Sequence, residues 1–131
     1  MEDTGRQIVE ALASRPDDER PWQALRRAFD VVVQMNDAAP EQALRFLRML
    51  QGTPSPRARH VEKQLGRQEM LAPEIARRLG VDSGRPEDTR PSAPAAAASA
   101  CVDVAAIAWP TTEGTVPLAV LLDHAMDALG E

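Results

Sequence analysis

Apolar side chains recur at the 3.6-residue spacing of a helix along most of the chain, and Pro and Gly residues interrupt the pattern. In the segment 21–36, for example, the apolar stripe contains Trp22, Leu25 and Phe29. The pattern predicts about six helices, at residues 4–14, 21–36, 40–50, 56–79, 93–109 and 116–129. With 131 residues the chain has the length of one domain, so we expect residues 1–131 to form a single all-α domain.

The segment 56–79 is the longest of these predicted helices. Pro73 removes one backbone hydrogen bond and should therefore kink or divide the helix. Gly80 is the expected helix stop, with Val81 folding back onto the last turn. One face of the helix is predicted to carry Val61, Leu65, Gln68, Ala72, Ile75 and Leu79.

Residues 74–84 read like the first helix and the turn of a DNA-binding helix-turn-helix. A recognition helix that enters the major groove would have to follow this turn. The next residues, 85–91, contain two prolines and two acidic side chains, and they cannot form such a helix. An ordinary amphipathic helix with a Gly cap is the favoured interpretation.

The overall composition limits the possible functions. The net charge is −5, which argues against a broad surface for a polyanion. Cys101 is the single cysteine, and the N-terminus has no apolar signal core, so we expect a protein of the reducing cytoplasm. The uncharged stretch 91–102 is too short and too weakly apolar to span a bilayer, and we expect no membrane contact.

The last two predicted helices carry most of the case for a homodimer. The helix 93–109 is lined with Ala, and its polar members are Ser99 and Asp103. The helix 116–129 has a broad Leu face, so two such hairpins from two subunits would form a four-helix bundle. The alternative is that the protomer's own core uses both faces. The predicted interface contains Ala97, Cys101, Val104, Ala108, Leu118, Leu121, Leu122, Ala125 and Leu129.

No catalytic set emerges from the sequence, and we expect neither enzymatic activity nor a cofactor. A nucleophile and its base would have to come from Cys101 or a Ser and from His60 or His124. In an Ala-rich helix, Cys101 is better explained as a buried and inert thiol. Asp123, His124 and Asp127 are better explained as a solvated face than as a metal site.

Two groups of residues are candidates for binding a small molecule. Arg59, Lys63 and Arg67 follow one another at intervals of four, with Arg57 and His60 nearby, and predict either an anion contact or a solvated basic face. Asp103 is a carboxylate on an otherwise apolar helix, which leaves three alternatives. It would orient a ligand, pair with an Arg, or lie on the solvent-exposed edge of the helix. The candidates for lining an adaptable apolar pocket are Trp22, Phe29, Met35, Phe46, Met49, Met70, Asp103 and Trp109.

In helix order and spacing the chain resembles the C-terminal domain of TetR-type (tetracycline-repressor-like) transcriptional regulators. The stretches that carry the resemblance cover nearly the whole chain: ALASRPDDERPWQALRRAF, PEQALRFLRML, LAPEIARRLGVD, APAAAASACVDVAAIAW and VPLAVLLDHAMDAL. The resemblance implies a helical domain that binds a small-molecule effector, dimerises through its last two long helices and shifts a preceding three-helix DNA-binding domain.

The sequence departs from this family pattern at its N-terminus. The DNA-binding domain would need roughly fifty further residues, so we expect it to be absent from this chain and expect DNA contact only through it. The favoured hypothesis is a ligand-sensing and dimerisation domain with an apolar or amphipathic effector. The alternative is a free-standing helical interaction or adaptor protein without a small-molecule pocket.

Overall fold

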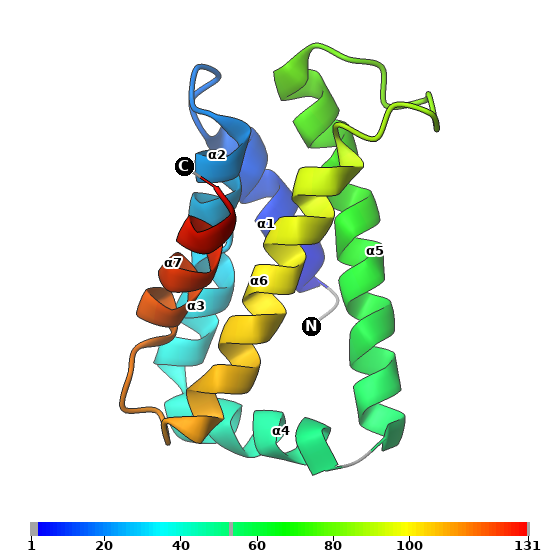
Figure 1. Cartoon of the computed structure of the whole chain (residues 1–131). Helices are drawn as coiled ribbons and strands as arrows, with labels where there is room; N and C mark the ends of the chain where they lie inside the picture. The colour runs from blue at the N-terminus through cyan, green and yellow to red at the C-terminus, as the bar shows by residue number, and fades with distance from the viewer. Residues whose placement is uncertain (1–2, 53, 131) are drawn as a thin grey trace.

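The computed structural model describes residues 3–52 and 54–130, and the side chains of residues 3, 55–57 and 60 are left aside. Within this part of the chain there are seven helices and no strands, so the predicted all-α bundle is confirmed (Figure 1). The helices are α1 (Asp3–Ser14), α2 (Pro21–Ala28), α3 (Asp30–Ala38), α4 (Pro40–Gly52), α5 (Pro54–Leu79), α6 (Ser92–Thr111) and α7 (Leu118–Leu129).

The helix α6 forms the centre of the bundle. It runs antiparallel to α5, and α4 crosses the end of the bundle where α5 begins and α6 ends (Figure 1). It packs against α5 and α7 and also contacts α2 and α4. Buried side chains from α1, α2, α5, α6 and α7 form one core, whose largest members include Ile8, Leu12, Leu25, Phe29, Leu71, Ile75, Leu122 and Met126.

The predicted helix 21–36 is divided in the structure at Phe29. The backbone of Phe29 has a ψ of −2°, far from the usual helical value, and it ends α2 and begins α3. The carbonyl of Phe29 still accepts hydrogen bonds from the amides of Val32 and Val33. This bend lets α2 pack on α6 while α3 packs on α7.

The helix α5 continues through Pro73, so the predicted division does not occur. The helix ends as predicted at Gly80, which has a positive φ of 72°. The amide of Gly80 donates to the carbonyl of Arg77, and the amide of Val81 donates to that of Ala76, which is a Schellman motif. Residues 81–91 contain no helix, so residues 74–84 are not half of a helix-turn-helix.

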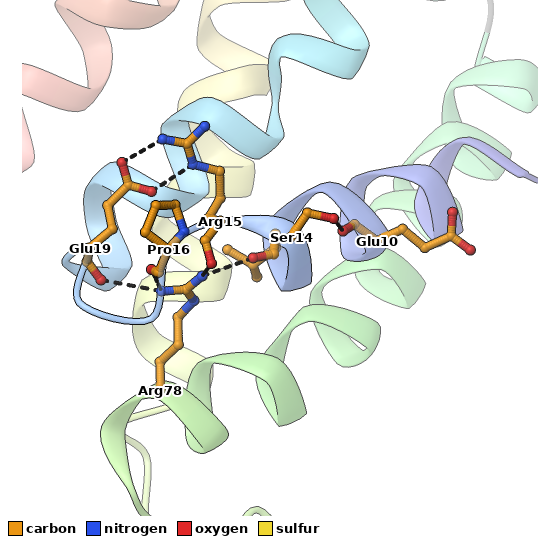
Figure 2. A network of polar contacts seen from close by, with 7 residues as sticks. Glu10, Ser14, Arg15, Pro16, Glu19 and Arg78 are labelled. Carbon is orange, nitrogen blue, oxygen red and sulfur yellow. Dashed lines mark hydrogen bonds and ion pairs between the residues drawn. The ribbon is translucent and has the colours of Figure 1, made fainter.

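Arg78, near the end of α5, fastens this helix to the loop between α1 and α2 (Figure 2). Its Nη1 donates to the carbonyls of Pro16 at 2.8 Å and Glu19 at 3.3 Å. Its Nη2 donates to the carbonyls of Leu12 at 3.0 Å and Arg15 at 2.9 Å. One side chain therefore donates to four backbone acceptors at and beyond the end of α1, two of which, those of Leu12 and Pro16, also accept a backbone amide.

The helix α7 is tied to α2 by two side chains. The indole Nε1 of Trp22 donates to the carbonyl of Met126 at 3.1 Å. The guanidinium of Arg26 pairs with both Asp30 and Asp123, so Asp123 is not merely a solvated residue. Gly130 lies so close to Trp22 that a Cβ at this position would overlap the indole ring.

The length and composition of α6 would also suit a membrane span. The helix has 20 residues, its mean hydropathy is 1.3, and 39% of that window is buried in the bundle. The uncharged stretch 91–102, from which no span is predicted, covers little more than half of this helix. A core helix meets the same criteria, and the position of α6 between α5 and α7 identifies it as one.

Candidate functional site

A cavity of about 300 Å³, partly open to solvent, lies where α4, α5 and α6 meet. Its wall is mostly aliphatic, with a few polar side chains, which is the usual character of small-molecule sites. Gln51, on α4, donates to the carbonyl of Ile107 at 3.4 Å and so links the crossing helix to α6. The lining residues are Leu47, Leu50, Gln51, Val61, Gln64, Asp103, Ala106 and Ile107.

Two polar side chains from opposite helices meet at the cavity wall. The amide Nε2 of Gln64, on α5, donates to the carboxylate Oδ1 of Asp103, on α6. Burial raises the pKa of Asp103, while the charge of Arg67 and the hydrogen bond from Gln64 act in the opposite direction. Asp103 therefore has partners inside the bundle and does not simply lie on a solvent-exposed edge of the helix.

Arg67 lies one helical turn beyond Gln64 on α5, deeper in the bundle. Its guanidinium carbon sits 5.6 Å from the ring centroid of Phe29, in cation–π contact. Burial lowers the pKa of Arg67, and the Asp103 carboxylate partly offsets this effect. Among the described residues, no hydrogen-bond partner is found for the buried Nε and Nη2 atoms of Arg67.

Ser99 adds a further unsatisfied polar group to the same region. It is fully buried and lies four residues before Asp103, on the same side of α6. Its hydroxyl has no partner within the part of the chain that the structure describes. Most buried polar atoms in proteins are hydrogen-bonded. The unpartnered atoms of Ser99 and Arg67, each one helical turn from a residue that lines the cavity, therefore need an explanation.

The pocket residues predicted from the sequence lie in three different places. Asp103 lines the cavity. Phe29 and Trp109 are buried in the core, and Trp22 packs against it. The remaining four are exposed: Met35, Phe46, Met49 and Met70. Aromatic and Met side chains thus serve mainly as core or surface residues here, while shorter aliphatic side chains form the cavity.

The predicted basic stripe does not form a single face. Arg59 and Lys63 are exposed, whereas Arg67 turns into the bundle. Positions i and i+8 of a helix differ by about 80° around the axis, which is enough to move Arg67 from the surface to the interior. The side chains of Arg57 and His60 lie outside the described residues.

The buried face of α5 was also misjudged from the sequence. Val61, Leu65 and Leu79, predicted to face inward, are exposed. The inward face instead carries the buried side chains of Gln64, Leu71 and Ile75, together with the half-buried Arg67. Periodicity of apolar residues cannot detect a buried face that carries polar side chains, so Gln64 was missed.

The predicted dimer residues divide between the core and the surface. Cys101, Leu118 and Leu122 are buried in the protomer's own core, and burial raises the pKa of the Cys101 thiol. Val104 and Leu129 are exposed. Ala97, Ala108, Leu121 and Ala125 are half-buried. Cys101, Leu118 and Leu122 therefore do not belong to an outer surface.

The outer face of α6 carries a continuous uncharged stripe that the sequence only partly identified. Its six members follow one another at alternating intervals of four and three residues, which is the pattern of a helix face that packs against another helix. We call them the α6 outer stripe: Ala93, Ala97, Ala100, Val104, Ile107 and Thr111. Val104 is 58% exposed and Ile107 is 56% exposed, high values for aliphatic side chains on a central helix.

A family model described as the MftR C-terminal domain, from the group of TetR-type C-terminal domains, matches residues 19–131 of the chain. No curated protein and no solved structure gives a significant match. The matched region begins just before α2 and includes the cavity, the polar side chains beside it and the α6 outer stripe.

Proposed function

The chain belongs to the MftR C-terminal domain family of TetR-type regulators, and we propose that residues 1–131 form one effector-sensing and dimerisation domain of a cytoplasmic transcriptional regulator. The family is regulatory rather than catalytic, and C-terminal domains of TetR-type regulators typically dimerise and bind small molecules. Regulation of DNA binding then depends on a domain outside these residues.

The observation that carries the proposal is the cavity between α4, α5 and α6. Its volume of about 300 Å³ is at the lower end of the range for small-molecule sites. Three helices contribute to its wall, so a ligand that fills it contacts all three at once. A ligand that binds one arrangement of these helices better than another shifts the population toward that arrangement.

The α6 outer stripe is the proposed surface for the second copy of the chain. Its Ala residues allow two helices to approach closely, and Val104 provides the larger apolar contact. Ile107 lies at the border between the stripe and the cavity that it also lines. The helix contains no Lys or Arg, so equivalent helices from two protomers would not repel one another through cations. Leu121 and Ala125, half-buried on the adjacent α7, would flank this interface.

The effector site is tested by a thermal-shift screen of small molecules on the wild-type chain and two variants. Ala106 lines the cavity, so Ala106→Phe should fill it, whereas Ala128→Phe adds the same ring to an exposed position of α7. A ligand at one hundred times its Kd stabilises a protein by about 2.7 kcal/mol, which corresponds to roughly 10 °C in Tm for a domain of this size.

We expect hits that raise the Tm of the wild type and of Ala128→Phe but not of Ala106→Phe. Compounds that stabilise all three proteins equally would place the binding site elsewhere. A screen without hits, on a chain that is monomeric, would favour the adaptor function over the sensing function.

A further inference from the structure

The two unpartnered nitrogens of Arg67 lie on one edge of the guanidinium group. Nε and Nη2 point in nearly parallel directions from that edge, and among the described residues neither has a hydrogen-bond partner. This pair of donors matches the spacing of the two oxygens of a carboxylate, which binds an arginine edge through two parallel hydrogen bonds.

Phe29 and Asp103 lie near Arg67, but neither accepts a hydrogen bond from this edge, whose two nitrogens are shielded from solvent. Phe29 lies against the guanidinium group rather than bonding to its donors. Asp103, the nearby carboxylate, instead accepts a hydrogen bond from Gln64. Arg67 thus has a counter-charge close by but lacks the hydrogen bonds that its buried donors require.

The buried groups without partners around Asp103 also indicate which head group a ligand would need. Within residues 3–52 and 54–130, the buried side-chain atoms without a partner in this region are the two Arg67 nitrogens and the Ser99 hydroxyl. All three can donate a hydrogen bond. A ligand that supplies acceptors would satisfy them, whereas an amine would add further donors.

From this geometry we infer that the effector is an apolar molecule ending in a single carboxylate, which binds side-on to Nε and Nη2 of Arg67. The inference rests on the proposed effector function of the cavity. The apolar body occupies the space between Leu47, Leu50 and Ile107. A phosphate dianion fits less well, because it would bring two negative charges beside Asp103 with one guanidinium to balance them.

The position of the head group gives the Gln64–Asp103 hydrogen bond a specific role. Gln64 and Asp103 line the cavity, whereas Arg67 lies one turn deeper. A carboxylate that enters from the cavity reaches Arg67 only when the contact between Gln64 and Asp103 opens. Effector binding is thereby coupled to a change in the packing of α5 against α6.

The inference is tested by isothermal titration calorimetry with three probes that share one chain and differ in the head group: decanoate, 1-decanol and decylamine. The proteins are the wild type, Arg67→Lys and Asp103→Asn. Lysine retains the positive charge but lacks the planar edge with two donors. Asparagine removes the carboxylate that repels the ligand while preserving the shape of the side chain.

We expect decanoate to bind the wild type at least tenfold more tightly than either other probe. Arg67→Lys should weaken decanoate at least tenfold and change 1-decanol less than twofold. Asp103→Asn should strengthen decanoate severalfold, because one negative charge is removed from the site.

Three results would overturn the inference: no binding of decanoate, equal binding of decanoate and 1-decanol without an effect of Arg67→Lys, or preferential binding of decylamine that Asp103→Asn abolishes. The proposed function has a separate criterion. If one of these results appears together with compounds that stabilise the wild type but not Ala106→Phe, the inferred carboxylate head group is wrong, whereas the proposed effector site is supported.

Discussion

Replacement of Arg78 by Ala should lower the free energy of unfolding by about 3 kcal/mol, with a fall of roughly 10 °C in Tm. The side chain donates four hydrogen bonds to backbone carbonyls of residues 12, 15, 16 and 19. A hydrogen bond from a charged donor contributes about 1.5–3 kcal/mol, and the four are not additive because one guanidinium makes them all. Urea denaturation followed by circular dichroism measures the change.

The neighbouring residue provides a matched control for this prediction. Arg77 is half-exposed, and it pairs with Glu74 and Asp17 at the surface. Surface ion pairs contribute about 0–1 kcal/mol, so Arg77→Ala should change stability by less than about 1 kcal/mol. Equal losses in the two variants would show that the four carbonyl contacts of Arg78 do not fasten α5 to the α1–α2 loop.

Val104→Arg should convert the proposed dimer into a monomer. Val104 lies in the middle of the α6 outer stripe, and a charge at the centre of an apolar interface must be desolvated without a partner. A loss of about 3 kcal/mol raises the dissociation constant of the dimer by roughly a hundredfold. Sedimentation velocity over a range of protein concentrations measures this shift directly.

Met35→Arg is the control for Val104→Arg. Met35 is similarly exposed but belongs to α3, so the variant adds the same charge outside the α6 outer stripe. It should sediment like the wild type. If both variants remain dimeric, the second copy binds to another surface, and the α6 outer stripe has a different purpose.

The helices of this chain could be predicted well from the sequence because local signals define them. Pro residues mark the starts of α2 and α4, and Gly80 marks the end of α5. The bend at Phe29 could not be predicted, because it depends on how α2 and α3 pack against two different helices. Pro73 was overestimated as a helix breaker, since α5 runs through it.

The site was harder to predict than the fold, for a reason that α6 illustrates. This helix is apolar on all sides, so its sequence does not distinguish the face in the core from the outer face. Cys101 and Val104 therefore seemed equivalent, although the first is buried and the second is exposed. Asp103 was recognised because it is the charged residue of this helix, and its link to Gln64 required the antiparallel packing of α5 and α6.

The helix α5 connects the two polar features described above. It carries Gln64 at the cavity, Arg67 one helical turn further on and Arg78 at the α1–α2 loop. The helix α5 therefore contacts both the cavity and the end of α1. This arrangement gives the proposed sensing domain a physical connection between its ligand and its first helix.

The central claim, that the chain is a dimeric sensor of a small molecule, is tested most directly by native mass spectrometry of the purified wild-type chain. The measurement reports the assembly and any retained ligand together. The account predicts a dimer that carries a small-molecule adduct, whose mass would identify the effector. A monomer without an adduct would contradict both the effector site and the interface on the α6 outer stripe.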